Sequence, residues 1–158
     1  FILIDSPAGI DEGFQVAIHA AQEALVVVTP EVTSIRDADK VIGLLEAKGI
    51  SNINLLINRI KPEMVKAENM MSVSDVKDIL GVPLIGVVPD SEQVITASNR
   101  GEPLVLEEKL SIPGLAFINT AQRLMGEVVD FIDFDSPPSK NPLKRLIKNL
   151  VRRPNASY

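Results

Sequence analysis

The sequence predicts an α/β fold in which a doubly wound, mostly parallel sheet carries helices on both faces. Continuous apolar runs of four or five residues recur along the chain, as in strands that are buried on both sides. Segments with a single apolar helical face lie between these runs. The resulting order, strand and helix alternating up to a fourth strand, is typical of parallel sheets built from strand–helix–strand units.

Composition predicts one ordinary domain and excludes several functions. The chain has 158 residues, of which 46% are hydrophobic, and a mean hydropathy of +0.18. No stretch reaches the roughly 18 to 20 apolar residues of a spanning helix. The lack of cysteine excludes disulfides and thiolate chemistry, and a single histidine, His19, argues against histidine-based catalysis. Because the chain opens inside an apolar run without Met, we expect it to be the C-terminal part of a longer protein.

The apolar runs and capping signals place the elements in order. Strands are expected at residues 1–4, 24–28, 53–57 and 84–88. Helices are expected at 11–21, at 33–48 with Thr33 or Ser34 as the cap, at 72–80 with Ser72 or Ser74 as the cap, at 91–98 and at 113–126. In the third of these helices, Val73, Val76, Ile79 and Leu80 are predicted to face inward.

Each predicted strand ends in a polar or turn-forming signature. The four signatures are Asp5-Ser-Pro, Thr29-Pro-Glu, Asn58-Arg59 and Pro89-Asp90. Because parallel strands end at one edge of a sheet, we expect a nucleotide or another small ligand there, although ordinary turn chemistry explains any single signature. A carboxamide such as that of Asn58 offers the donor and acceptor that a purine edge requires.

The first signature has two interpretations. Asp5 at a strand end can hold a water on Mg²⁺, and Gly9 lets a backbone N–H approach a phosphate closely. Alternatively, an acid in this segment caps the following helix.

The last residues differ in character from the rest. Residues 140–153 contain six basic residues and no acidic residue, whereas the remainder has 10 basic against 21 acidic residues. After Pro142, one helical face is apolar and the other basic. The apolar positions are Leu143, Leu146, Ile147, Leu150 and Val151, and the basic ones include Lys144, Arg145, Lys148 and Arg152. This pattern favours an interfacial membrane helix over two alternatives, a helix docked on the acidic body and an arm for nucleic acid.

Several motifs, in order, make the chain resemble the deviant-Walker P-loop ATPases of the MinD/ParA family, and MinD-type members in particular. The motifs are Asp-Ser-Pro-Ala-Gly-Ile at 5–10, Thr-Pro-Glu-Val-Thr-Ser-Ile-Arg-Asp-Ala-Asp at 29–39, Met-Met-Ser-Val at 70–73, Leu-Ile-Gly-Val-Val-Pro-Asp at 84–90 and Ser-Asn-Arg-Gly-Glu-Pro at 98–103. The resemblance covers essentially the whole chain except the linker. It implies residues 1–130 as the C-terminal part of an ATPase domain, 131–141 as a linker and 142–153 as a membrane-targeting helix.

The resemblance also implies site residues and partners. It assigns Asp5 to Mg²⁺ through water and Gly9 to the second switch, which senses the γ-phosphate. It assigns Asn58, Arg59, Pro89 and Asp90 to an adenine pocket. The exposed positions Arg36, Asp37 and Asp39 would lie near the surface where MinD-type members meet MinC and MinE. ATP with Mg²⁺ would drive homodimerisation and attachment to the inner face of the cell membrane, or to a membrane facing the plastid stroma, in division-site selection.

One part of the family pattern is missing. No Gly-Lys-Ser or Gly-Lys-Thr occurs anywhere in the chain, so the phosphate-binding loop and the first switch are not present. We therefore expect the 158 residues alone neither to hold a triphosphate nor to hydrolyse it. Two rival interpretations remain, a ParA-like DNA-segregation ATPase and a non-enzymatic scaffold tethered to the membrane.

Overall fold

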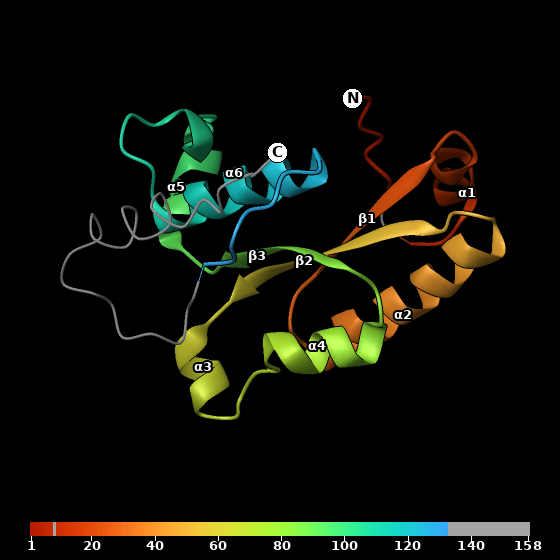
Figure 1. Cartoon of the computed structure of the whole chain (residues 1–158), viewed down its shortest axis with the longest axis horizontal. Coiled ribbons are helices and arrows are strands. Elements are labelled where there is room, and N and C mark those ends of the chain that lie inside the picture. Colours follow the sequence, from red (N-terminus) through yellow and green to blue (C-terminus); the bar gives the residue numbers. More distant parts are fainter. Residues whose placement is uncertain (8, 133–158) are drawn as a thin grey trace, which may run out of the picture.

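A computed structural model describes residues 1–7 and 9–132. At its centre lies a three-stranded parallel sheet in the order β1-β2-β3 (Figure 1). Val28 of β1 is paired with Ile57 of β2, and Ile57 with Val87 of β3. The three strands span Glu23–Val28, Asn52–Ile60 and Leu84–Pro89. The predicted parallel α/β architecture is therefore confirmed.

Two helices cover one face of this sheet and enclose the larger core. They are α2, Val32–Ala47, and α4, Val73–Leu80. Alternate residues of β2 point toward them, because successive side chains of a strand face opposite sides of a sheet. Three of these, Ile53, Leu55 and Ile57, are between 0% and 3% exposed. Burial of each such side chain contributes roughly 1.5–3 kcal/mol.

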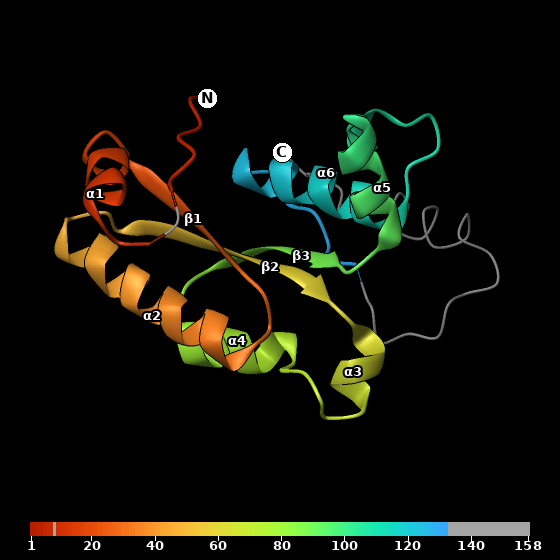
Figure 2. The same cartoon turned by 180° about the vertical axis from the view of Figure 1, so that it is seen from behind.

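A single long helix, α6, packs on the opposite face. It spans Ile112–Leu124 and lies across the sheet from α2 and α4 (Figure 2). Its Ala116 forms a second buried cluster with Leu56 and Val88. The approach is close because Gly86 of β3 has no side chain: a Cβ there would lie 2.8 Å from Thr120 Cγ2. Helices on both faces confirm the doubly wound arrangement.

Four short elements complete the described part of the chain. They are α1, Glu12–His19; α3, Pro62–Lys66; α5, Glu92–Arg100; and η1, a 3₁₀ helix over Leu104–Leu106. Phe14 attaches α1 to the larger core. Of the two predicted caps, Ser72 is the one that caps α4: its Oγ accepts the Asp75 N–H at 3.1 Å, and Asp75 Oδ2 accepts the Ser72 N–H at 2.8 Å.

The predicted opening strand is wrong. Residues 1–4 form no strand, and Phe1 and Leu3 are 94% and 86% exposed. A strand exists only where a neighbour completes its hydrogen-bond ladder, and within residues 1–7 and 9–132 no segment pairs with this run. The apolar composition of residues 1–4 suits a strand, but composition does not show which strand, if any, would pair with it.

Three smaller expectations also need correction. Helix α2 begins at Val32, before the expected caps, and Ser34 Oγ instead accepts the N–H of Thr29 at 3.1 Å. Ile79 is 51% exposed because α4 turns only Val76 and Leu80 fully into the core. Helix α3 was not expected.

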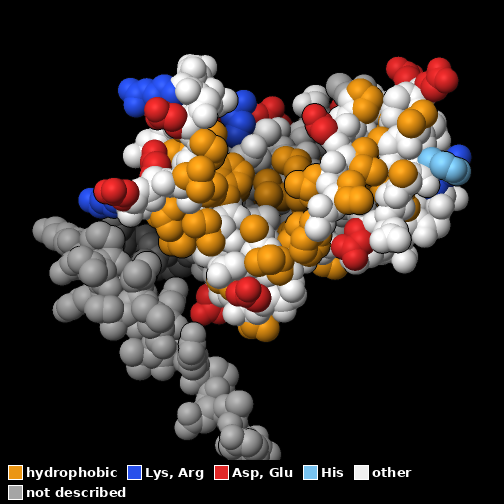
Figure 3. All heavy atoms as spheres, turned by 90° about the horizontal axis from the view of Figure 1, so that it is seen from above, with side chains coloured by type: hydrophobic (Ala, Val, Ile, Leu, Met, Phe, Trp, Pro, Cys, Tyr) orange, Lys and Arg blue, Asp and Glu red, His pale blue; other side chains and the backbone are white. Residues whose placement is uncertain are grey.

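Strand β1 is covered on one face only, although its sequence predicts burial on both. Leu25 and Val27, which alternate with the buried Val26 and Val28, are 41% and 55% exposed. Seen from above, hydrophobic side chains spread across the surface between the α5–α6 side and the α1 side (Figure 3).

No helix of the described residues has both the length and the apolar character to cross a membrane.

Candidate functional site at the carboxyl edge of the sheet

Three of the four predicted polar signatures meet at one edge of the sheet. Val28 is paired with Ile57, so Thr29 and Asn58 follow at neighbouring positions of that edge. Asp90 follows β3, and its N–H donates to the Ile60 carbonyl at 2.9 Å. The fourth signature does not join them, because Asp5 lies in the exposed opening segment.

The end of β2 is irregular at the two residues that the sequence singled out. Its pairing with β3 shifts register between Ile57 and Ile60, so that Asn58 and Arg59 lie outside the regular ladder. Arg59 has φ of 59°, a left-handed conformation that costs a residue with a side chain roughly 1–2 kcal/mol. Backbone strain of this kind concentrates at binding sites and turns that must aim a side chain.

Asp90 holds the strained segment in place. Its carboxylate accepts Arg59 Nε at 3.2 Å through Oδ1 and pairs with Lys61 Nζ at 3.2 Å through Oδ2. The hydrogen bond from Lys61, followed by that from Arg59, keeps the pKa of Asp90 below its usual 3.8 against the opposing effect of desolvation. The carboxylate is therefore ionised at neutral pH and ties β2 to β3 at their carboxyl ends.

Asn58 keeps part of its hydrogen-bonding capacity. Its Oδ1 accepts the N–H of Arg59 at 2.9 Å, and the residue is half-buried. No partner for Nδ2 occurs among the residues that the structure describes. The amide can thus donate to a heterocycle placed at this edge.

The second predicted surface lies on α2. Arg36, Asp37 and Asp39 are all exposed, as expected, and Lys40 Nζ lies 3.5 Å from Asp37 Oδ1. This pair is exposed on both sides, so it contributes little to stability, and its charges are accessible to a partner.

The remaining predicted site residues are not brought together. Gly9 has φ of +94°, the left-handed conformation for which glycine is suited, but it lies with Asp5 in the exposed opening segment. No cluster of three or more His, Cys, Asp or Glu side chains suited to a metal occurs in residues 1–7 and 9–132. The residues predicted to bind a membrane, Leu143 to Arg152, lie outside the described residues.

The sequence did not reveal the roles of Lys61 and Met70 at this edge. Lys61 forms the second ion pair of Asp90, and its N–H donates to Met70 Sδ at 3.3 Å, which links the edge to the segment between α3 and α4. A basic residue two positions after Arg59 was the available signal, but only the register shift shows that it points to Asp90.

A scan against models of known protein families found no match. Individual proteins, however, are very similar. A septum site-determining protein MinD from Emiliania huxleyi is 84% identical over all 158 residues, which cover 58% of its own length. The chain belongs to the MinD family. It spans about half the length of the curated MinD relatives it matches.

Solved structures agree with this assignment. MinD from Aquifex aeolicus is 52% identical with a TM-score of 0.77, over 81% of this chain and 54% of the other, and the MinC:MinD complex of that organism aligns equally well. MinD from Pyrococcus horikoshii, solved with Mg-ADP, is 30% identical with a TM-score of 0.69, over 78% of this chain and 49% of that one. The fold and the motifs predicted from sequence therefore belong to MinD proteins.

Proposed function

We propose that this chain forms the base-binding and membrane-attaching part of a MinD-type ATPase that positions the division site. The observation that carries the proposal is the joining of Asn58, Arg59 and Asp90 at the carboxyl edge of a parallel sheet. Ligands of open α/β sheets bind outside the carboxyl ends of the strands. The Pyrococcus horikoshii protein was solved with Mg-ADP, which supports a nucleotide as the ligand of this fold.

The edge suits an adenine base. Asn58 supplies an amide donor, Pro89 supplies an apolar residue at the end of the neighbouring strand, and the Asp90 ion pairs tie the two strand ends together. An amide that hydrogen-bonds one base leaves groups unpaired with another, which is how such a site discriminates. We infer that Asn58 sets a preference for ATP over GTP.

Mg²⁺ belongs with the phosphates. Mg²⁺ is usually held by one or two carboxylates together with phosphate oxygens and waters, so the single carboxylate of Asp5 is a sufficient protein contribution through a water. Gly9, in its left-handed conformation, suits a loop that approaches a γ-phosphate closely. When bound, the metal supplies neutralisation of the charge that develops on the phosphates.

We propose that nucleotide-driven dimerisation controls membrane attachment. The five basic residues from 144 to 153 contribute about 1 kcal/mol each at an anionic surface. Partial burial of the five aliphatic side chains adds roughly 1 kcal/mol each. Ordering about ten residues costs roughly 1 kcal/mol or more per residue, so one tail binds marginally. Two tails on one dimer gain effective concentration, with avidity of about 10² or more. Attachment would be to the inner face of the cell membrane, or to a membrane facing the plastid stroma.

The exposed face of α2 is the proposed partner surface. Arg36, Asp37 and Asp39 present both charge signs on a rigid helix. A MinC:MinD complex of Aquifex aeolicus is among the similar structures, which supports MinC as a partner. We assign MinE to the same surface.

The test uses a chimaera in which this chain is joined to the remaining residues of the Emiliania huxleyi relative. We expect ATP to bind it with Mg²⁺ and to outcompete GTP, and we expect Asn58→Ala to reduce this preference more than it reduces turnover at saturating ATP. Lys66→Ala, an exchange on α3 away from the Asp90 network, is the matched control. An unchanged ratio of ATP to GTP affinity in Asn58→Ala contradicts the base-binding assignment.

A further inference from the structure

A groove on the α5–α6 side is not used by the proposed nucleotide edge. It is formed by α5, the loop that leads to η1, and α6, and it is an open depression of about 410 Å³. This volume lies within the range of about 300–1,000 Å³ found for binding pockets. We call it the α5–α6 groove. It is lined by Val94, Ala97, Ser98, Gly101, Glu102, Pro103, Leu104, Val105 and Phe117.

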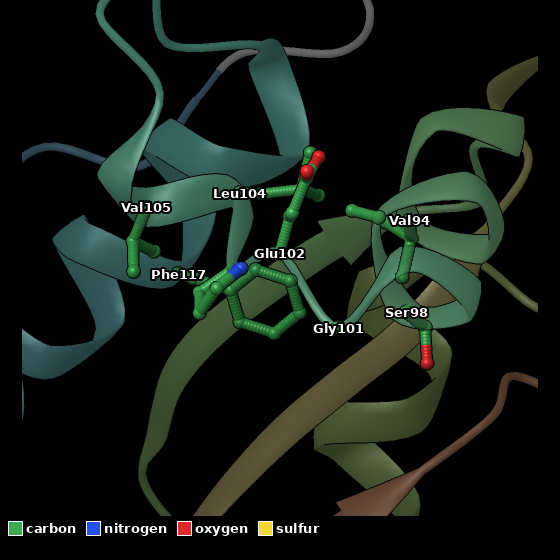
Figure 4. A pocket seen from close by; sticks show the side chains of 9 residues that line it. Val94, Ser98, Gly101, Glu102, Leu104, Val105 and Phe117 are labelled. Atoms are coloured by element: carbon green, nitrogen blue, oxygen red, sulfur yellow. The ribbon is translucent and has the colours of Figure 1, made fainter.

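The walls of the α5–α6 groove are apolar, and one acid stands among them. Figure 4 shows side chains from α5, from η1 and from α6 around the same space, with the Phe117 ring among them. Leu104 and Ala97 form a buried floor, whereas Val105 is 39% exposed. Such a surface fits an apolar helix face with i, i+3, i+4 and i+7 anchors rather than a polar ligand.

The chain itself supplies a segment of this chemistry, and the end of the described part lies within reach. Ile132, the last described residue, packs against the cluster of Leu56, Val88 and Ala116, and Phe117 of the groove packs against the same cluster. Ten residues separate Ile132 from Leu143. For any chain of ten residues, the root-mean-square span is roughly 18 Å as a random coil and about 30–35 Å when fully extended.

The point of departure is held firmly. The Arg123 guanidinium donates to the carbonyls of Ile85, Val129 and Asp130 at 2.8–2.9 Å and lies 3.8 Å over the Phe131 ring. These contacts bind residues 129–131 to α6 and β3. The tail therefore starts from a fixed place on the face of the sheet that α6 covers, which raises its concentration near the groove.

Charge favours the same pairing. Residues 92–112, which include α5 and η1, contain four acidic residues and two basic ones, whereas residues 140–153 carry six basic residues and no acid. Glu102 lines the groove, and Glu107 and Glu108 directly follow η1. Opposite charges at the rim orient an amphipathic helix whose apolar face is inserted.

We propose that, away from a membrane, residues 143–151 dock their apolar face in the α5–α6 groove of the same chain. Docking buries Leu146, Ile147 and Leu150 and makes the tail unavailable for membrane binding. A membrane competes for the same apolar face, so the groove lowers attachment of single chains and sharpens the dependence on dimerisation. This inference goes beyond the proposed membrane attachment, and its test needs no membrane and no nucleotide.

The test is paramagnetic NMR on the full 158-residue chain. The chain has no cysteine, so Asn149→Cys provides one attachment point for a nitroxide on the polar face of the tail. We expect broadening of the backbone amide signals of Ser98, Val105 and Phe117, and none at Asp39 on the far face of the sheet. Broadening spread evenly over the surface, or absent from the groove, overturns the proposal.

A matched pair of variants separates docking from proximity. Val105→Glu places a charge in the groove at a partly exposed position, and it should lower the ratio of docked to free tail about tenfold, equal to about 1.4 kcal/mol. Leu106→Glu changes a neighbour that is 79% exposed and does not line the groove, and it should leave the ratio unchanged. Equal effects of the two variants contradict insertion into the groove.

A mixture of differently labelled chains tests whether the docked tail comes from the same chain or from a second copy. Nitroxide-labelled chains without ¹⁵N are combined with unlabelled ¹⁵N chains. We expect no broadening in the mixture, because docking is within one chain. Broadening of Ser98 and Val105 in the mixture would mean that a second copy supplies the tail and would overturn the intramolecular proposal.

Discussion

Replacing Gly86 by alanine should destabilise the protein although alanine is among the smallest changes available. A Cβ at this position would collide with Thr120 Oγ1, and it would lie 2.8 Å from Thr120 Cγ2 and 3.1 Å from Leu56 Cδ1. Ordinary contact between carbon atoms is about 3.5–4.0 Å, so α6 must move away from β3 by a large fraction of an ångström. Overpacking of this kind costs about 1–3 kcal/mol, and we expect Gly86→Ala to lie in that range.

Urea unfolding, followed by far-ultraviolet circular dichroism, measures the effect as a lower midpoint at unchanged slope. Gly43→Ala is the control. Gly43 lies within α2, and a Cβ added there would meet no atom within 4 Å apart from the adjoining backbone of its own helix, so the substitution should stabilise by about 0.5–1 kcal/mol. Thr120→Ala removes both colliding atoms, and the double variant should recover at least about 1 kcal/mol relative to additivity. Strictly additive effects, or a stability of Gly86→Ala equal to wild type, would refute the close contact between α6 and β3.

Three further predictions concern stability. Arg123→Lys should lower the free energy of unfolding by about 2 kcal/mol, because one ammonium cannot reach three carbonyls in two segments. Hydrogen exchange should then show lost protection at residues 126–132. Unchanged protection there would show that Arg123 does not hold this segment in place. Asp90→Asn should lower stability by about 0.5–1 kcal/mol above pH 5, since two cations keep the folded pKa of Asp90 below 3.8. The contribution of the carboxylate to stability is lost as pH falls through that lowered pKa. Urea midpoints of the two proteins at pH 7 and pH 3 check this, and a difference between them that persists undiminished at pH 3 contradicts it. Ser72→Ala should cost about 1 kcal/mol through loss of the capping box while Ser72→Thr should cost little, and equal midpoints for the two variants would show that the cap does not stabilise α4.

The strands and the carboxyl edge could be predicted because they depend on local patterns. Continuous apolar runs marked β1, β2 and β3, and parallel strands necessarily end at a common edge. The cap of α4 was readable as one of two serines, Ser72 or Ser74, but the reciprocal hydrogen bonds with Asp75 that single out Ser72 were not predicted. The exposed face of α2 followed from helical periodicity alone.

What the sequence did not reveal depends on contacts between distant segments. The opening run has the composition of a strand, yet a strand forms only against a neighbour, and none pairs with it in the described residues. The role of Lys61 follows from a register shift between β2 and β3, which no local pattern encodes. Position 86 needs a glycine because any larger residue would collide with Thr120, which lies 34 positions later in the sequence.

The central claim, that this chain serves a nucleotide-controlled membrane switch, is tested most directly by vesicle sedimentation. The chimaera with the Emiliania huxleyi relative is mixed with anionic vesicles of phosphatidylglycerol and phosphatidylcholine in the presence of ATP or ADP. We expect sedimentation with ATP and little with ADP, and we expect Ile147→Glu to abolish it without affecting dimerisation, because a charge in the middle of the apolar face cannot enter the bilayer interface. Lys148→Gln should only weaken it, and more so at high salt. Sedimentation of Ile147→Glu equal to that of the parent protein would contradict the account.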